Sequence, residues 1–397
     1  PLYSSAASDV YKRQVLYFCR VMAGLYIHIP FCASRCVYCD FFSSTDFSFK
    51  RGYIDAVCRE LELRIHELRD KPVFTVYLGG GTPSSLSPSE RGRLFRTLST
   101  VVDWSICKEV TLEVNPDDVT PLFISQLKDT PVNRLSMGIQ SFDDSDLVFL
   151  RRRHTAHAAM EAVDNCLCAG YENISIDLIY GLPGQTVERW TNNLRQAVTL
   201  NVPHISAYNL IYEEGTALWR MREKGLVKEC EEEESLQMFE TLIDVLGFSG
   251  YEHYEISNFA RSGRYALHNT SYWKGVPYLG LGAAAHSYDG KSRRINPSSL
   301  SEYMEALQTG HVAYMEEKET VDSLYNEYIL TSLRTCWGLN LKKLEDDFGT
   351  ERMQYCLEQA LPHIRAGRLV VTDDVMRITR KGLFTSDDVM SDLFWVD

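Results

Sequence analysis

Residues 24–41 read GLYIHIPFCASRCVYCDF, a short apolar run followed by Cys32, Cys36 and Cys39. The apolar run, 25–29, is typical of a β-strand. Thiolates on a C-x-x-x-C-x-x-C spacing can converge on one metal centre from a single loop, and three soft ligands suit iron and sulfur. A cubane cluster has one iron more than these cysteines can hold, so that iron would be open to an external chelator. The stretch therefore predicts a reactive iron–sulfur site on a loop that leaves a strand.

Two other states of these cysteines compete with a cluster. Structural zinc sites usually close with a fourth Cys or His, often in a second C-x-x-C pair, and none follows within reach. Phe41 stands two residues past Cys39, so a local fourth thiolate is absent, although His28 offers a nitrogen ligand. Plain reduced thiols are the remaining alternative. The spacing favours an open iron–sulfur site over both.

Composition indicates a large globular protein. The chain has 397 residues, of which 45% are hydrophobic, enough for two or three domains. The net charge of -13 argues against a nucleic-acid partner held through phosphates. The 11 cysteines are odd in number and scattered, which indicates a reducing compartment, the cytoplasm, and not a disulfide framework. No run of about 18 apolar residues occurs, so no transmembrane helix is expected.

The first 21 residues are unlike the rest. The apolar stretch VLYF, 15–18, is too short for a secretory signal and is followed by Cys19 and Arg20. We expect 1–21 to be a non-native leader, with the native pattern beginning at Met22.

Strand-like and helix-like segments alternate after the cysteine loop. Apolar or β-branched runs at 25–29, 73–78, 110–114, 134–139, 174–179 and 205–210 predict strands. Helical patterns lie at 51–69, 88–101, 119–128, 155–169, 187–200 and 231–246. Continuously apolar strands joined by helices predict an α/β fold with a parallel sheet covered by helices.

Polar residues gather at the predicted carboxyl ends of these strands, where parallel sheets build ligand sites. Gly79, Gly80, Gly81 and Thr82 follow the second strand, and a glycine run lets the backbone approach a ligand closely. Each of the others could alone be a capping group, but five units point polar groups at one face. These others are Glu113, Asn115, Gln140, Ser141 and Asp177, with Arg152 nearby as a bidentate donor to a carboxylate.

The residues around the cysteines resemble the radical S-adenosylmethionine superfamily, which has an aromatic residue, here Tyr38, before its third cysteine. Seven motifs in order resemble the group that contains the oxygen-independent coproporphyrinogen oxidases and the heme chaperone HemW: YIHIPFCASRCVYCDF, LGGGTPSSL, EVNP, RLSMGIQSF, LRRRHT, SIDLIYGLPGQT and YEISNFA. The resemblance implies a partial (β/α)6 TIM-like barrel and a [4Fe-4S] cluster on Cys32, Cys36 and Cys39. It also implies that S-adenosyl-L-methionine contacts Tyr26, Tyr38, Gly80, Gly81, Thr82, Glu113, Gln140, Arg152 and Asp177.

Within this group the sequence favours the chaperone over the oxidase. Oxidases of this type have a further cysteine at the position of Phe41 and an extended segment before the position of Met22. The run HNTSYW, 268–273, matches the HNxxYW motif associated with heme handling, which implies heme contact by His268, Tyr272 and Trp273. A polar loop with a packing role is the alternative for this run. The implied activity is transfer of heme to an acceptor, a respiratory protein being one candidate; radical decarboxylation of coproporphyrinogen and a non-enzymatic iron sensor are the alternatives.

One segment departs from the group's pattern. The usual LGLGPGAHS reads LGLGAAAHS here, with Ala283 and Ala284 in place of Pro and Gly. Loss of that rigid and permissive pair should change the local turn. His286 is kept, as a rim residue or a heme ligand.

The C-terminal part of the chain has a different order of predicted elements from the alternating region. Helical patterns followed by RLVVTDDVMRIT, a hairpin turning at Asp373 and Asp374, predict a winged-helix-like α+β domain. Its second helix mixes both charges and contains Pro362, which makes it a poor DNA-reading helix, so we expect a cover for the barrel or a partner surface. The expected domains are 22–250 for the barrel, 251–319 for the HNxxYW segment and 320–397 for this module.

Overall fold

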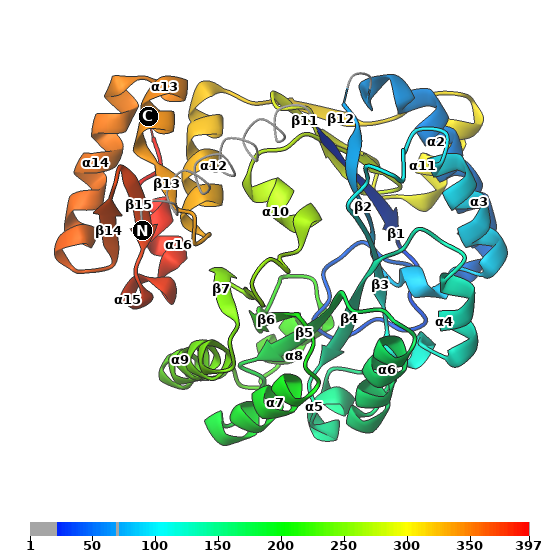
Figure 1. Ribbon diagram of the computed structural model, residues 1–397, viewed down its shortest axis with the longest axis horizontal. Helices are drawn as coiled ribbons and strands as arrows, with labels where there is room; N and C mark the ends of the chain where they lie inside the picture. Colours follow the sequence, from blue (N-terminus) through cyan, green and yellow to red (C-terminus); the bar gives the residue numbers. More distant parts are fainter. Residues whose placement is uncertain (1–21, 69–70, 397) are drawn as a thin grey trace, which may run out of the picture. The chain divides into compact units, whose positions relative to one another are not determined.

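The computed structural model describes residues 22–68 and 71–396, so the predicted leader lies outside the described residues (Figure 1). The chain forms two compact units. The first consists of the described part of Pro1–Gly138 with Glu161–Glu172 and Leu267–Glu317, and the second of Ile139–Met160, Asn173–Ala266 and the described part of Lys318–Asp397. Both units are built from separate stretches of the chain, and the domain boundaries expected from the sequence stay a prediction.

The alternating region contains the elements that the sequence predicts, with ends that differ by a few residues. Its strands are β1 (Ala23–Ile29), β2 (Val73–Gly80), β3 (Glu109–Val114), β4 (Arg134–Gln140), β5 (Ile174–Tyr180) and β6 (His204–Asn209). Its helices are α2 (Lys50–Arg64), α3 (Pro88–Leu98), α4 (Pro121–Leu127), α5 (Asp144–Phe149), α6 (Ala156–Cys168), α7 (Val187–Thr199), α8 (Ala217–Glu223) and α9 (Glu232–Phe248). Local signals mark several helix starts; α3, for example, begins with a capping box of Ser87 and Glu90.

The first unit is built on parallel strands. β1 pairs with β2, β2 with β3 and β3 with β4, all parallel. On its other side β1 pairs in parallel with β9 (Tyr278–Leu281), with Gly24 opposite Tyr278. β10 (His286–Tyr288), β11 (Ser292–Ile295) and β12 (Met315–Lys318) extend the sheet beyond β9. The alternate residues Leu25, Ile27 and Ile29 of β1 are fully buried, as expected of a central strand.

Helix α2 anchors the region around β9 through a buried ion pair. α2 packs against α3 and against α11 (Leu300–Gln308) (Figure 1). From α2, Arg64 donates to Glu60 at 2.8 Å, and both side chains are 1% exposed or less. Arg64 also donates to the carbonyl oxygen of Gly280 at 3.0 Å, while Glu60 accepts from the backbone N–H of Gly282 at 2.8 Å. One helix therefore holds the strand and the turn that follow α10.

The second unit has its own strands. β5 and β6 are parallel, and β8 (Asn258–Ala260) and β7 (Glu252–Glu255) follow β6 in antiparallel pairing. Burial is continuous over much of β5, where only Asp177 interrupts a run of buried residues. Asp177 is thus the one residue of this core strand that is only partly buried.

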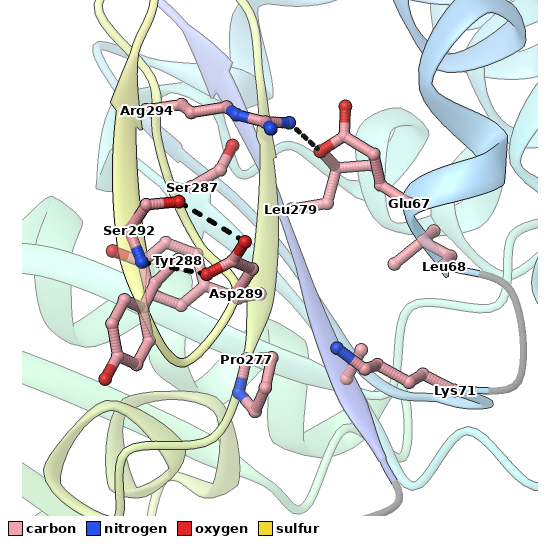
Figure 2. A pocket seen from close by; sticks show the side chains of 12 residues that line it. Glu67, Leu68, Lys71, Pro277, Leu279, Ser287, Tyr288, Asp289, Ser292 and Arg294 are labelled. Carbon is pink, nitrogen blue, oxygen red and sulfur yellow. Dashed lines mark hydrogen bonds and ion pairs between the residues drawn. The ribbon is translucent and has the colours of Figure 1, made fainter. Parts of the chain in front are cut away.

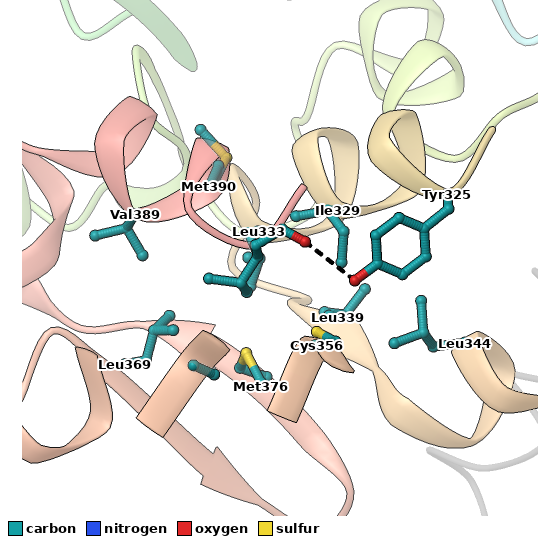
Figure 3. Packing of buried hydrophobic residues seen from close by; sticks show 12 residues of the cluster. Tyr325, Ile329, Leu333, Leu339, Leu344, Cys356, Leu369, Met376, Val389 and Met390 are labelled. Atoms are coloured by element: carbon teal, nitrogen blue, oxygen red, sulfur yellow. Dashed lines mark hydrogen bonds between the residues drawn. The ribbon is translucent and has the colours of Figure 1, made fainter. Parts of the chain in front are cut away.

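The C-terminal part of the second unit has a separate apolar core. Its helices are α12 (Val321–Leu333), α13 (Leu341–Phe348), α14 (Thr350–Arg365), α15 (Arg380–Leu383) and α16 (Ser386–Ser391). Strands β14 (Leu369–Thr372) and β15 (Val375–Ile378) form the predicted hairpin, and β13 (Leu339–Asn340) pairs with β15. Figure 3 shows side chains from α12, α13, α14 and α16 and from the three strands converging on one cluster. Within the cluster, the Tyr325 hydroxyl donates to the carbonyl oxygen of Leu393 at 3.1 Å.

Within residues 22–68 and 71–396, every helix is too short or too polar to cross a bilayer.

Candidate functional site

The cysteine loop leaves the carboxyl end of β1. Its entrance is fixed by two backbone hydrogen bonds, from Cys32 N–H to the Ser44 carbonyl at 3.0 Å and from Ser44 N–H to the Pro30 carbonyl at 2.6 Å. Cys32, Cys36 and Cys39 are all half-buried. The structure therefore places the three thiols on one partly accessible loop at the strand end where the sequence predicts them.

The chemistry of this donor set fits an iron–sulfur cluster. Three thiols on one loop are soft ligands, and fewer than a structural zinc site requires. Burial raises the pKa of the Cys39 thiol to about 11, and nearby Cys36 and Cys32 add to the rise, so metal binding would release protons. Among the described residues no three His, Cys, Asp or Glu side chains are gathered closely enough to hold a metal ion. The loop thus carries three candidate thiol ligands but does not present them as a closed set.

The glycine run is locked against the start of the cysteine loop. The Gly81 N–H donates to the Ile29 carbonyl at 2.9 Å, and the Thr82 N–H donates to the Phe31 carbonyl at 2.8 Å. A Cβ on Gly81 would lie 2.8 Å from that same Ile29 oxygen. The Thr82 hydroxyl also donates to the sulfur of Cys32 at 3.5 Å. Glycine is needed here for packing as well as for any approach of a ligand.

Gly80 has a conformation that favours glycine, with a φ of +106°. A Cβ at this position would lie 2.3 Å from the His28 ring. His28 itself bonds the Tyr26 hydroxyl through Nδ1 at 2.9 Å and the Phe42 carbonyl through Nε2 at 3.0 Å. His28 is therefore engaged between β1 and the end of the cysteine loop.

Glu113, on β3, is held by two donors from β2. The Tyr77 hydroxyl donates to Oε1 at 2.7 Å, and the Gly80 N–H donates to Oε2 at 3.0 Å. Next to it, the Asn115 side-chain amide donates to the Thr82 hydroxyl at 3.1 Å. The first unit thus brings Glu113 directly to the glycine run.

Tyr38 lies half-buried within the cysteine loop.

Three predicted site residues lie in the second unit. Gln140 ends β4 with a φ of 72°, a left-handed conformation that is uncommon outside glycine. Arg152 is half-buried, whereas Arg151 and Arg153 are exposed, as expected for a solvated face. Asp177 is half-buried at the midpoint of β5, further from the carboxyl end of the strand than the sequence predicts.

The HNTSYW run is helical and not a polar loop. It lies in α10 (Leu267–Trp273), whose first two N–H groups, of Leu267 and His268, donate to the carboxylate of Glu109 at 2.9 Å each. Glu109 is 2% exposed and lies 3.9 Å from the guanidinium of Arg134. This buried carboxylate caps the helix N-terminus.

The His268 ring is enclosed, with 1% exposure. Its Nδ1 lies 2.8 Å from the Thr75 hydroxyl and its Nε2 lies 2.8 Å from the Tyr272 hydroxyl. Burial, with a smaller contribution from Arg134, lowers the pKa of His268 to about 3, so the imidazole is neutral. Trp273 is half-buried at the end of the helix.

An aromatic stack joins α10 to the strands of the first unit. Its consecutive ring centroids are 6.1 Å apart for Tyr26–Tyr77, 5.2 Å for Tyr77–His268, 5.0 Å for His268–Tyr272 and 4.7 Å for Tyr272–Tyr278. The sequence analysis did not identify Tyr77 as a site residue, because a tyrosine inside an apolar strand is usually a core residue. Its position two residues before the glycine run was the one feature that could have identified it.

After His268, the candidate heme ligands are His286 and then His253. His286 begins β10 and is exposed. His253 stacks on Phe259 at 4.2 Å, and its Nε2 bonds the Ile256 carbonyl at 2.9 Å.

Two hollows lie elsewhere in the units. In the first unit, a hollow at the amino ends of β1 and β9 is lined by Ala23, Pro277 and charged groups; Figure 2 shows Arg294 paired there with Glu67, at 3.1 Å. It lies at the opposite end of β1 from the cysteine loop, so it is not the predicted site. In the second unit, a cavity of about 380 Å³ lies at the carboxyl ends of β5 and β6, next to Gly181 and Asn209.

Comparison with known proteins defines the class. Residues 26–197 match the radical SAM superfamily and residues 320–385 match the HemN C-terminal domain. In solved structures, the chain resembles coproporphyrinogen III oxidase (HemN) from Escherichia coli with a TM-score of 0.82 and 23% identity, over 96% of this chain and 93% of that chain. This likeness confirms the predicted fold class, a partial α/β barrel with a C-terminal α+β domain, for a radical SAM protein.

The relatives narrow the class further. The chain is 34% identical to heme chaperone HemW of Lactococcus lactis over 92% of this chain and 95% of the relative. It is 33% identical to heme chaperone HemW of Bacillus subtilis over 83% of this chain and 87% of the relative. The chain belongs to the heme chaperone HemW family. Membership in the radical SAM superfamily implies a [4Fe-4S] cluster and S-adenosylmethionine as cofactors.

Proposed function

We propose that this protein is a heme chaperone, which binds heme and transfers it to an acceptor protein. The observation that carries the proposal is the similarity to HemW of Lactococcus lactis, which extends over 92% of this chain and is not limited to the superfamily core. A respiratory protein is the acceptor that we favour. We place the protein in the cytoplasm, where the cysteines would stay reduced.

The proposal includes a cluster held by Cys32, Cys36 and Cys39, with an exchangeable S-adenosylmethionine on its open iron. The cluster would supply an iron with a free coordination position for the methionine part of that molecule. The contacts proposed in the first unit are Tyr26, Tyr38, Gly80, Gly81, Thr82 and Glu113. Those proposed in the second unit are Gln140, Arg152 and Asp177. Glu113 is suited to hold an ammonium group or ribose hydroxyls, because its carboxylate is already positioned by Tyr77 and Gly80.

The cluster is tested by replacing Cys32, Cys36 and Cys39 together with serine. After anaerobic reconstitution we expect about four irons per chain in the unchanged protein and almost none in the triple variant. Cys168→Ser is the matched control, since Cys168 is an exposed cysteine at the end of α6. A colourless protein filled with zinc after careful anaerobic work would contradict the cluster.

Heme contact is proposed at α10, through His268, Tyr272 and Trp273. The neutral His268 imidazole can ligate iron, and the aromatic rings can cover the porphyrin. Because the Tyr272 hydroxyl lies 2.8 Å from Nε2, iron would reach this nitrogen only after Tyr272 moves aside.

The heme contact is tested with His268→Ala, measured by heme titration and absorption spectra. We expect weaker heme binding and an altered spectrum with unchanged iron and sulfide content, whereas Cys36→Ser should damage the cluster more than heme affinity. Unchanged heme affinity and spectrum in His268→Ala would move the search to the exposed His286 and then to His253.

A coproporphyrinogen oxidase is the second candidate, favoured by the fold likeness to HemN. An anaerobic assay with reductant and coproporphyrinogen III separates the two candidates. Product formation at catalytic rates would overturn the chaperone proposal. A non-enzymatic iron sensor would give neither product nor heme transfer.

A further inference from the structure

We propose that Tyr77 is a positioning residue that couples the glycine run and Glu113 to helix α10. Through it, the affinity for S-adenosylmethionine and the affinity for heme would depend on each other. This inference rests on the proposed function, because it takes Glu113 as a cofactor contact and α10 as a heme contact. It adds a physical link between the two, within the first unit.

At one end of the link, the Tyr77 hydroxyl fixes a carboxylate. It donates a hydrogen bond to Glu113 Oε1 at 2.7 Å, and the Gly80 N–H donates to Oε2 of the same carboxylate at 3.0 Å. The two bonds leave the carboxylate little freedom to rotate. A ligand group that bonds Glu113 therefore has to accommodate, or displace, the Tyr77 hydroxyl.

At the other end, the Tyr77 ring supports His268. The two rings stack at 5.2 Å with planes 28° apart, and the His268 ring in turn bonds Thr75 and Tyr272. Thr75 and Tyr77 both belong to β2. With Gly80, which ends the same strand, β2 thus contacts the imidazole twice and Glu113 twice.

The link is closely packed, so a shift at one end has no free space to absorb it. Tyr77 is 9% exposed, Thr75 1% and His268 1%. A Cβ on Gly79 would lie 2.6 Å from the Tyr77 ring and 2.8 Å from Glu113 Oε1. Packed groups of this kind respond by moving between discrete arrangements rather than by compressing. As proposed above, heme binding moves the Tyr272 hydroxyl away from His268. The His268 ring then loses a hydrogen-bond partner, and its stacking on the Tyr77 ring changes as a result.

Linkage makes the effect reciprocal and measurable. Coupling between two sites typically changes affinity by about 5- to 150-fold. The dissociation constant for S-adenosylmethionine is measured on anaerobically reconstituted protein by equilibrium dialysis, with and without saturating heme. In the unchanged protein we expect the two constants to differ by about fivefold or more.

Two conservative variants test the route of the coupling. Tyr77→Phe keeps the ring on His268 but removes the bond to Glu113, so heme should change its S-adenosylmethionine affinity by less than about twofold. Tyr272→Phe removes the bond to His268 and leaves the hydroxyl of Tyr77 in place. It should shift S-adenosylmethionine affinity by about threefold or more in the absence of heme, if the link exists. Tyr171→Phe, a buried tyrosine of the same unit outside the aromatic stack, is the matched control. Unchanged iron content and melting temperature verify that each variant is folded.

The outcomes separate this inference from the proposed function. Binding of both ligands with no mutual effect, together with unchanged affinity in Tyr272→Phe, overturns the coupling and leaves the chaperone proposal intact. Absence of heme binding overturns the chaperone proposal. In that case the link is still tested by comparing the S-adenosylmethionine affinities of Tyr272→Phe and Tyr171→Phe without heme. Absence of S-adenosylmethionine binding overturns the coupling and the proposed cofactor contacts, and leaves heme binding as the separate test of the chaperone proposal.

Discussion

Replacing Glu60 with alanine should strongly destabilise the first unit. This carboxylate has no exposed surface, and it accepts hydrogen bonds from four groups. The donors are the Arg64 guanidinium at 2.8 Å, the Gly282 N–H at 2.8 Å, the Asn296 amide at 2.8 Å and the Tyr303 hydroxyl at 2.6 Å. Removing Glu60 leaves all of these donors without this acceptor, in a region closed to water.

The size of the loss follows from the ion pair. Breaking a buried ion pair by removing one partner costs about 3–5 kcal/mol. Arg64 keeps a second carboxylate, Glu67, at 2.9 Å, which places the expected loss at the lower end, about 3–4 kcal/mol. The free energy of unfolding is measured by urea unfolding of the metal-free protein. A second measurement, of hydrogen exchange at the Gly280 and Gly282 amides, reports the local loss.

The same helix supplies the control. Arg59 and Glu62 form an ion pair at 2.9 Å with side chains 50% and 57% exposed, so Glu62→Ala should cost no more than about 0.5 kcal/mol. A loss below about 1 kcal/mol in Glu60→Ala would refute the reasoning, since buried donors would then have found other acceptors without cost.

Two further predictions concern stability. Ala284 has a φ of +59°, where an L-residue is strained by about 1–2 kcal/mol. Ala284→Gly relieves this strain, but the greater entropy of the unfolded glycine chain costs about 0.4–1 kcal/mol of stability. We therefore expect a net stabilisation of about 0.5–1 kcal/mol, measured by urea unfolding. A destabilised glycine variant would contradict the strain. Burial, helped by the charges of Arg152 and Arg153, lowers the pKa of His154 to about 4. The unfolded state then binds more protons below pH 6.5, so between pH 7 and pH 5 the unchanged protein should lose about 2 kcal/mol more than His154→Gln, measured as unfolding free energy. Equal pH dependence in both proteins would show that His154 titrates normally.

The strands were predictable because their burial is two-sided. β1 shows this, since residues buried on both faces give a continuous apolar run that needs no knowledge of neighbours. The cysteine loop and the glycine run were predictable for a different reason, because each is a pattern of neighbouring residues in the sequence. The hairpin turn at Asp373 and Asp374, both with positive φ, was equally local.

What the sequence did not reveal depends on distant partners. The α10 helix is only seven residues long and is capped by Glu109, 158 positions earlier in the chain, so no local signal marks its start. Glu60 and Arg64 have the spacing of an ordinary surface pair on a helix, and only the strands packed over α2 show that they are buried. Tyr77 is distinguished from a core residue by Glu113 on the neighbouring strand.

The pairing of β9 with β1 has a consequence for how the protein is made. One edge of β1 receives its partner from Tyr278–Leu281, so that edge stays without it until the ribosome has translated far beyond the cysteine loop. At about 5–20 residues per second, the roughly 250 intervening residues take about 13–50 s. During that time the nascent chain presents an open strand edge next to its cysteines. A cell that makes this protein therefore needs to protect the growing chain from association within this interval.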